Sequence, residues 1–295
     1  MLRKLRRICC VFMMMGSASL ALAAGKTPES GRMSAMYSYA PSQVLRFEYT
    51  KGKIYLEATV NDTHKGRYLF DTCQGILALD KNLAEKMGLK TIGTITAHSA
   101  NGEAHTATLS TIASFTIGAQ RMNNPTVGIS DFSGGIDGII GGLFFEEFTI
   151  TIDFPNKTIY FENDESLLYR RRAGAIVPVS IERYRQWGLD FYVLVQFNDK
   201  WVRQWAVDTG RYNSMFNMED VPLLTGGIPL HQLKKNPEDV SLSLLDCPQI
   251  RMDNPRLNPE KAIKDGLLGN SFMQNYIITF NIRDGYMIFA EPEKK

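Results

Sequence analysis

Two aspartates in matching surroundings are the residues of this sequence best suited to chemistry. Asp71-Thr72 follows the apolar run Tyr68-Leu69-Phe70, and Asp208-Thr209 follows Trp205-Ala206-Val207. Turn-forming residues come next in both places, so each carboxylate is expected where a buried strand gives way to a loop. Two carboxylates within hydrogen-bond reach share one proton and can act as base and acid on a water molecule. A lone Asp-Thr pair is common in turns, so the hypothesis of a catalytic carboxylate pair depends on the second copy.

The two Asp-Thr pairs belong to a longer internal repeat. Residues 137–144 match residues 265–272, and residues 149–154 match residues 277–282, both at an offset of 128. The Asp-Thr pairs themselves lie 137 positions apart. Because the matches follow one another in the same order, the chain is expected to hold two homologous halves.

With these motifs in place, the chain resembles the retropepsin/pepsin-like aspartic peptidases. Asp208-Thr209-Gly210 has the intact family motif, whereas Asp71-Thr72-Cys73 has Cys in place of Gly. Each copy is followed by an apolar-apolar-Gly strand, at residues 139–141 and 267–269. Two lobes in one chain resemble pepsin, whereas the short sequence motifs are more similar to those of the retropepsin-like domains of bacterial envelope proteins. The resemblance covers about residues 45–165 and 175–292.

The resemblance implies an all-β fold of two homologous β-barrel lobes with a cleft between them. It implies an aspartic endopeptidase that acts on a peptide or unfolded protein substrate without a cofactor. A hairpin at residues 94–109 would be the family's flap, or else a plain surface hairpin. The implied residues are catalytic Asp71 and Asp208, supporting Thr72, Cys73, Thr209 and Gly210, and flap residues Ser99, Ala100, Asn101 and Gly102. Thr72 and Thr209 are expected to hydrogen-bond across the lobe junction.

Three residues depart from the family pattern, namely Cys73, Gln74 and Arg211. A side chain at position 73 is expected to shift the loop or to point its sulfur beside the dyad, with strain if the position is left-handed. An alternative function is therefore a catalytically impaired pepsin-fold protein that binds a peptide or protein in the envelope. A third hypothesis is a structural protein whose two lobes are sealed; solvent access to the aspartates separates it from the others.

Composition excludes several other classes. Hydrophobic residues at 44% and charged residues at 22% are globular values. A net charge of +2 without a basic, aromatic-rich stripe gives no sign of nucleic-acid binding. The four histidines, at positions 64, 98, 105 and 231, have no metal-ligand spacing, so no metal site is predicted. Cys73 as a thiol nucleophile lacks a supporting sequence context.

The first residues have the pattern of a secretory signal. A basic start is followed by an apolar run of about 15 residues and by Ala21-Leu22-Ala23, a signal-peptidase site. The protein is therefore expected to be exported, periplasmic or secreted, with no stable membrane span after cleavage. The predicted organisation is a signal peptide at 1–23, an irregular lead-in at 24–44, an N-terminal lobe at 45–165, a linker at 166–174 and a C-terminal lobe at 175–295.

Signal cleavage would leave Cys73 and Cys247 as the mature cysteines. The repeat places Cys73 at the motif and Cys247 on a strand away from it, so a disulfide between them is not expected. Within the first lobe, residues 45–49 and 54–60 are predicted to form a hairpin. Residues 80–89 have helical spacing with Gly88 as a stop.

Overall fold

The structure, a computed structural model, is mostly β, and its strands form three sheets. None of its helices is long and apolar enough to cross a membrane, within the part of the chain that can be described. The described residues are 41–98, 104–132, 134–184, 188–220, 240–253, 255, 257–260 and 266–292. The predicted signal peptide, most of the lead-in and the flap residues Ser99 to Gly102 lie outside them.

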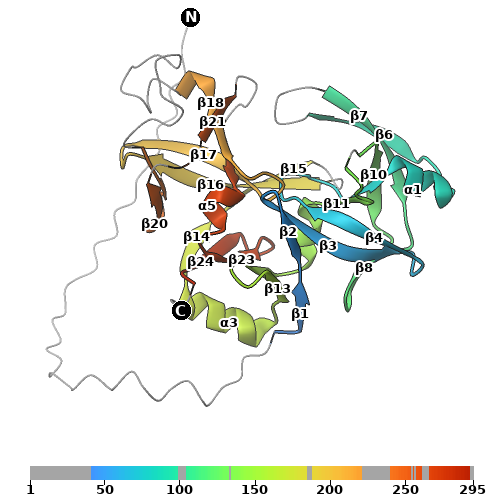
Figure 1. Ribbon diagram of the computed structural model, residues 1–295, viewed down its shortest axis with the longest axis horizontal. Coiled ribbons are helices and arrows are strands. Elements are labelled where there is room, and N and C mark those ends of the chain that lie inside the picture. The colour runs from blue at the N-terminus through green and yellow to red at the C-terminus, as the bar shows by residue number, and fades with distance from the viewer. Residues whose placement is uncertain are drawn as a thin grey trace, which may run out of the picture. The chain divides into compact units, whose positions relative to one another are not determined.

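The N-terminal sheet is built around a hairpin that leads to Asp71. Its strand order is β6-β7-β10-β5-β11-β4-β3-β8-β9, and β2 also pairs with β3 (Figure 1). Strand β3 alternates buried and less buried residues, as the sequence predicts for a half-buried strand. Lys51 and Gly52 turn the chain between β2 and β3 with positive φ, as a tight hairpin requires. The bounds are β2 Glu48–Thr50, β3 Lys53–Val60, β4 His64–Phe70, β5 Ala78–Asp80, β6 Gly93–His98, β7 Ala104–Thr111, β8 Ser114–Ile117, β9 Gln120–Asn123, β10 Thr126–Ser130 and β11 Gly138–Ile140.

The C-terminal sheet is built around a second hairpin of the same kind, which leads to Asp208. Its order is β20-β19-β16-β17-β22-β18-β21, and β15 also pairs with β16. Asn198 and Asp199 turn this hairpin with φ of 49° and 53°, as Asn61 and Asp62 do in the first with 49° and 60°. The bounds are β15 Ser180–Tyr184, β16 Gly188–Phe197, β17 Trp201–Asp208, β18 Ser214–Asn217, β19 Ser241–Leu244, β20 Cys247–Asp253, β21 Leu257–Glu260 and β22 Gly266–Gly269.

A third sheet joins the two halves, with strand order β1-β13-β12-β23-β24-β14. At its centre β12 pairs antiparallel with β23, and Thr151 lies opposite Thr279. Strand periodicity and the repeat in the sequence do not predict this shared sheet. Residues 39–295 accordingly cluster as one compact unit. The bounds are β1 Gln43–Arg46, β12 Ile150–Asp153, β13 Thr158–Phe161, β14 Ala175–Pro178, β23 Ile277–Asn281 and β24 Tyr286–Ala290.

The helices are short and lie between strands. Helix α1 is shorter than the predicted helix at 80–89; Asp80 caps it, and Gly88 follows with φ of +63°. The stretch predicted as a linker at 166–174 is mostly helix α3, which a capping box at Asn163 starts. Strand β1 begins at Gln43, within the last two residues of the predicted lead-in at 24–44. The bounds are α1 Lys81–Lys86, α2 Gly142–Glu147, α3 Asp164–Ala173, the 3-10 helix η1 Met218–Asp220 and α5 Asn270–Met273.

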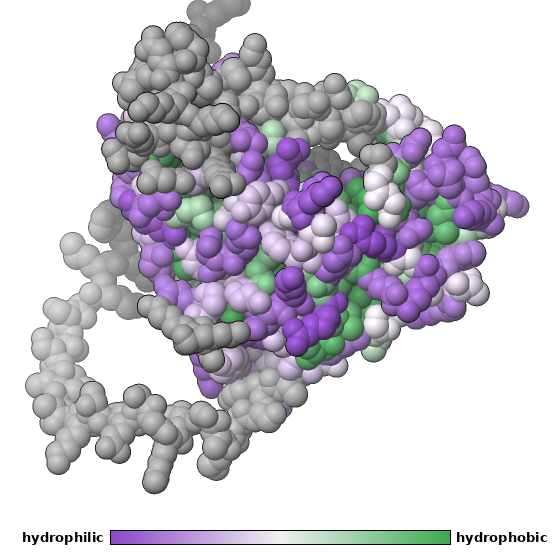
Figure 2. All heavy atoms as spheres, in the orientation of Figure 1, coloured by the Kyte–Doolittle hydropathy of each residue, from purple (hydrophilic) through white to green (hydrophobic). Residues whose placement is uncertain are grey.

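One apolar core runs through both halves. Phe145 of α2 packs against Phe70 of the first half and against Phe191 and Phe280 of the second, with ring centroids 4.6, 5.9 and 5.3 Å away. The face drawn in Figure 2 is mostly hydrophilic with smaller apolar patches. Aromatic packing around Phe145 therefore helps to hold the two halves together.

Candidate active site

Asp71 stands at the first position after β4. The strand is fixed by parallel pairing with β11, and the Asp71 N–H continues the ladder by donating to Ile140 O at 3.0 Å. The Cys73 N–H donates to Asp71 Oδ1 at 2.9 Å, so the loop main chain orients the carboxylate. Asp71 is half-buried, which leaves part of it open to solvent.

Asp208 is held in the same way at the end of β17, which pairs in parallel with β22. The Gly210 N–H donates to Asp208 Oδ1 at 2.9 Å. Arg211 Nε lies 3.6 Å from the other oxygen, Oδ2, and forms an ion pair with it. The Asp208 side chain is 7% exposed, so this aspartate is the more deeply placed of the two.

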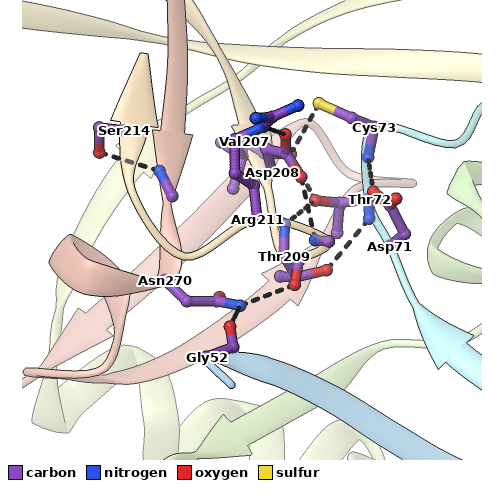
Figure 3. Close-up of polar contacts among 12 residues, drawn as sticks. Gly52, Asp71, Thr72, Cys73, Val207, Asp208, Thr209, Arg211, Ser214 and Asn270 are labelled. Atoms are coloured by element: carbon purple, nitrogen blue, oxygen red, sulfur yellow. Dashed lines mark hydrogen bonds and ion pairs between the residues drawn. The ribbon is translucent and has the colours of Figure 1, made fainter. Parts of the chain in front are cut away.

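Thr72 and Thr209 tie the two loops together by reciprocal hydrogen bonds, as the sequence analysis predicts (Figure 3). The Thr72 N–H donates to Thr209 Oγ1 at 3.1 Å, and the Thr209 N–H donates to Thr72 Oγ1 at 3.0 Å. Each hydroxyl then donates to a strand carbonyl of the opposite half, Thr209 Oγ1 to Phe70 O at 2.9 Å and Thr72 Oγ1 to Val207 O. Both side chains are buried, so every polar group of the bridge is satisfied inside the protein.

Gly210 lies between the two carboxylates. Its N–H binds Asp208, while a Cβ added at Gly210 would lie 2.1 Å from Asp71 Oδ2. Glycine is therefore needed at position 210 because there is no space for a side chain. A left-handed backbone is not the reason, since the φ of Gly210 is not positive. The close approach also brings Asp71 and Asp208 to the two sides of one residue.

Burial makes both carboxyl groups weaker acids. It is the largest cause of the raised pKa of Asp71, which the Cys73 N–H and the charges of Lys53 and Arg211 partly offset. Burial and then the negative charge of Asp71 raise the pKa of Asp208 to about 8, against opposing contributions from Arg211, the Gly210 N–H and Lys53. Both shifts favour the protonated form of a carboxyl group, so they favour retention of a proton by the pair at neutral pH.

Cys73 keeps the main-chain contact of the motif and does not strain the loop. Its φ is not positive, so the expected left-handed strain is absent. Sγ donates to Val207 O at 3.5 Å, and the side chain packs beside Ala206, Met215 and Leu267. Burial, followed by the charge of Asp208, raises the pKa of the thiol well above its usual value. The thiol stays protonated, which removes it as a candidate nucleophile.

The supporting strands expected behind the loops are present as β11 and β22, each between a parallel and an antiparallel neighbour. Sequence reasoning missed Asn270, whose side-chain amide donates to Gly52 O at 2.8 Å and to Thr209 O at 2.7 Å. It also missed that the charge of Lys53 acts on both aspartates. The 137-residue offset could have revealed it, because Lys53 corresponds to Asp190 just as Asp71 corresponds to Asp208.

Other predicted features fall outside this site. Strands β6 and β7 form the predicted hairpin, but its tip, Ser99 to Gly102, is not among the described residues. Cys73 and Cys247 are both free thiols, and the sequence does not predict a disulfide between them. Across the described ranges, no three His, Cys, Asp or Glu side chains gather as a metal-binding group.

Comparison with known proteins agrees with this geometry. Residues 56–144 match the aspartyl protease family. A search of curated proteins found no match. Among solved structures, the chain is similar to the crystal structure of Basic 7S globulin from soybean, with a TM-score of 0.54 and 9% identity over 84% of this chain and 94% of that chain. Residues 56–144 therefore match the aspartyl protease family, and the chain has a pepsin-like fold.

Proposed function

We propose that the protein is an aspartic endopeptidase in which Asp71 and Asp208 form the catalytic dyad. The observation that carries the proposal is the Thr72–Thr209 bridge, because it brings two oriented aspartates from opposite halves to one point. The exported location predicted from residues 1–23 belongs to the same proposal, as does a peptide or unfolded protein as substrate.

The proton held by the pair provides the chemistry. The ionised carboxylate takes a proton from a water molecule as the water attacks the peptide carbonyl carbon. The protonated carboxyl donates its hydrogen bond to the carbonyl oxygen as negative charge develops there. When the C–N bond breaks, the amine leaves with a proton from the dyad, and the pair returns to its starting state with one proton.

Two main-chain donors keep the carboxylates aligned during these transfers. The N–H groups of Cys73 and Gly210 each bind the Oδ1 atom of the aspartate in their own loop. The Oδ2 atoms are left for the water and the substrate, apart from the Arg211 ion pair on Asp208. Replacing Gly by Cys at position 73 keeps the donor, which is compatible with activity.

The first test is Asp208→Asn. Because Asn cannot hold or release the shared proton, cleavage of a denatured, alkylated polypeptide should fall by at least about a hundredfold. Circular dichroism should show an unchanged fold. Asp131→Asn, at an exposed aspartate in the same chain, is the control and should cleave normally. Persistent cleavage by Asp208→Asn would exclude this mechanism.

A second candidate function is peptide binding without cleavage. Arg211 supports it, because its guanidinium already pairs with the Asp208 oxygen that a catalytic water would need. Wild-type protein that binds unfolded polypeptide and never cleaves it would favour this candidate. The third hypothesis, a structural protein with sealed lobes, is disfavoured by the partial exposure of Asp71.

A further inference from the structure

We propose that Lys53 and Arg211, here named the cationic flank, bind a carboxylate of the peptide beside the scissile bond. The carboxylate is either an acidic side chain or the free C-terminus. This inference deepens the proposed peptidase function, and its primary test is binding, so that the two can fail separately.

Arg211 has unused binding capacity next to the dyad. Its side chain is 42% exposed, and Nε points at Asp208 Oδ2 from 3.6 Å, which is an ion pair beyond hydrogen-bond distance. Elsewhere in the described chain the guanidinium has no hydrogen bond or ion pair. A guanidinium presents five N–H donors in a planar fork that matches a carboxylate. Most of these donors face no acceptor of the described structure.

Lys53 is held on the same side of the dyad by its neighbours. Gly52 packs against Tyr212, since a Cβ at Gly52 would lie 2.4 Å from Tyr212 Cδ2. Gly52 O also accepts the Asn270 amide at 2.8 Å. The turn before Lys53 is therefore fixed against the loop that carries Arg211. The Lys53 charge lowers the pKa of both dyad carboxyls, in agreement with this position.

The Lys53 ammonium also lacks a partner in the part of the chain that the structure describes. Its side chain is half-buried, so it is partly withdrawn from water without a compensating ion pair. With one proton on the dyad, the two aspartates carry a single negative charge, against the two positive charges of Lys53 and Arg211. The cationic flank therefore has one positive charge in excess, and it should attract an anion.

The other side of the dyad has a different charge. In the repeat, Asp190 stands at the position of Lys53, and Gln74 at that of Arg211. Leu189 N, beside Asp190, donates to Gly75 O at 3.3 Å, and the Asp190 charge raises the pKa of Cys73. A peptide carboxylate is thus attracted to the cationic flank, whereas the equivalent positions on the other side hold Asp190 and Gln74 in place of two cations. The charge asymmetry fixes the direction in which an acidic peptide lies across the dyad.

The test measures binding of fluorescent octapeptides to the Asp71→Asn variant, which should not cleave them. Peptides carry Glu, Gln or Lys at each position in turn, and each is made with an amidated or a free C-terminus. We expect Glu at one position, or the free C-terminus, to tighten Kd by about tenfold over its neutral counterpart, with the gain shrinking as salt is added. Which of the two peptide series shows the gain assigns the source of the carboxylate.

Substitutions on that background locate the site. Lys53→Met keeps the aliphatic stem, and Arg211→Gln introduces the residue found at the equivalent Gln74. Each should remove most of the gain, measured within each variant as the ratio of the Kd values for the charged peptide and its neutral counterpart. Lys51→Met is the matched control in the same turn, at an exposed lysine, and should keep the gain. Lys53→Gln replaces Lys53→Met if circular dichroism shows that the latter is misfolded.

Three results would overturn the inference: equal binding of Glu and Gln peptides at every position with no gain from a free C-terminus, no peptide binding at all, or a gain that survives in both flank variants. The proposed function is judged separately on the wild type. Cleavage without charge preference would keep the peptidase and reject the flank. Charge-dependent binding without cleavage would keep the flank and reject the peptidase.

Discussion

Gly210 and Cys73 occupy the same position in their loops, yet they make different demands on their surroundings. Gly210 has no room for a side chain, because Asp71 Oδ2 occupies the space a Cβ would need. Cys73 has its side chain accommodated against Ala206 and Leu267 without backbone strain. The departure from the Asp-Thr-Gly motif therefore falls in the loop that can accept a side chain, beside the deeper aspartate, Asp208.

Gly210→Ala should inactivate the protein without unfolding it. The added methyl group would displace the Asp71 carboxyl group, and misplacing a catalytic group by about 1 Å costs about a hundredfold in rate. We expect that loss in kcat, with an unchanged circular dichroism spectrum. Gly93→Ala is the control, because nothing lies within 4 Å of its added Cβ. Full activity in Gly210→Ala would show that Asp71 need not stay where the structure places it.

At the scale of elements, the loops are positioned by contacts between halves as much as by their own strands. The β2–β3 turn reaches the second loop through Asn270, which binds Gly52 O and Thr209 O. A side-chain relay adds to this contact: Tyr49 donates to Gln274 at 3.2 Å, and Gln274 donates to Tyr212 at 3.2 Å. In the first half, the Gly142 N–H donates directly to Gln74 O at 2.6 Å.

Asn270→Ala should therefore impair both stability and catalysis. The buried Thr209 O and the partly buried Gly52 O lose their side-chain donor, which costs about 1–3 kcal/mol of unfolding free energy. The loop after Asp208 is then held only by its main-chain hydrogen bonds to α5, so kcat should fall. Asn275→Ala is the matched control, since its amide binds only Ser271 O and Phe272 O nearby. Urea unfolding and peptide cleavage separate the outcomes. Equal kcat in the two variants would mean that Asn270 is only structural.

The sequence predicts the local parts of this site well and its long-range parts poorly. The Asp-Thr loops and the strands behind them follow from strand periodicity and the repeat, and the Thr72–Thr209 bridge follows from the resemblance to the aspartic peptidases. The Arg211 ion pair and the Asn270 bridge depend on side-chain directions that periodicity does not contain. The segment predicted as a linker at residues 166–174 is mostly helical, a detail that the prediction did not include, although Asn163 and Ser166 form a capping box at its start.

At the scale of the whole molecule, the shared sheet makes the halves one folding unit. Main-chain pairing of β12 with β23 and the core around Phe145 both cross the boundary that the sequence places at residues 166–174. The prediction of two barrel lobes does not include the shared sheet, because pairing between strands more than a hundred positions apart cannot be recognised from the sequence of either strand alone. Both segments read simply as buried strands.

Stability should fall as pH rises across neutrality, because the dyad binds a proton in the folded state that the unfolded chain releases above about pH 4. The bound proton contributes fully to the free energy of unfolding below the pKa that the aspartate has in the unfolded chain. This contribution is lost as the pH rises through the folded-state pKa, which is about 8 for Asp208. Asp208→Asn, which removes this linkage, should melt higher than wild type at pH 8 and show a smaller drop between about pH 5 and 8.

Thermal unfolding at both pH values checks this expectation. Asp131→Asn, at an exposed aspartate, should keep the wild-type pH dependence. Identical pH dependence in wild type and Asp208→Asn would show that the buried pair does not hold its proton near neutrality. The same titration should set the alkaline limit of cleavage, because the acid of the dyad is lost over that range.

Thr151 and Thr279 lie at the symmetry axis that relates the two halves of the chain. The two hydroxyls meet at 2.7 Å, and the residues are equivalent in the repeat, so a local two-fold axis passes between β12 and β23. A dimer of identical halves about such an axis would present each residue twice. Joining the halves covalently frees each side to differ, as Lys53 differs from Asp190 and Cys73 from Gly210. A fused chain, unlike a dimer of identical halves, can therefore carry the charge difference by which the proposed cationic flank distinguishes one end of a bound peptide from the other.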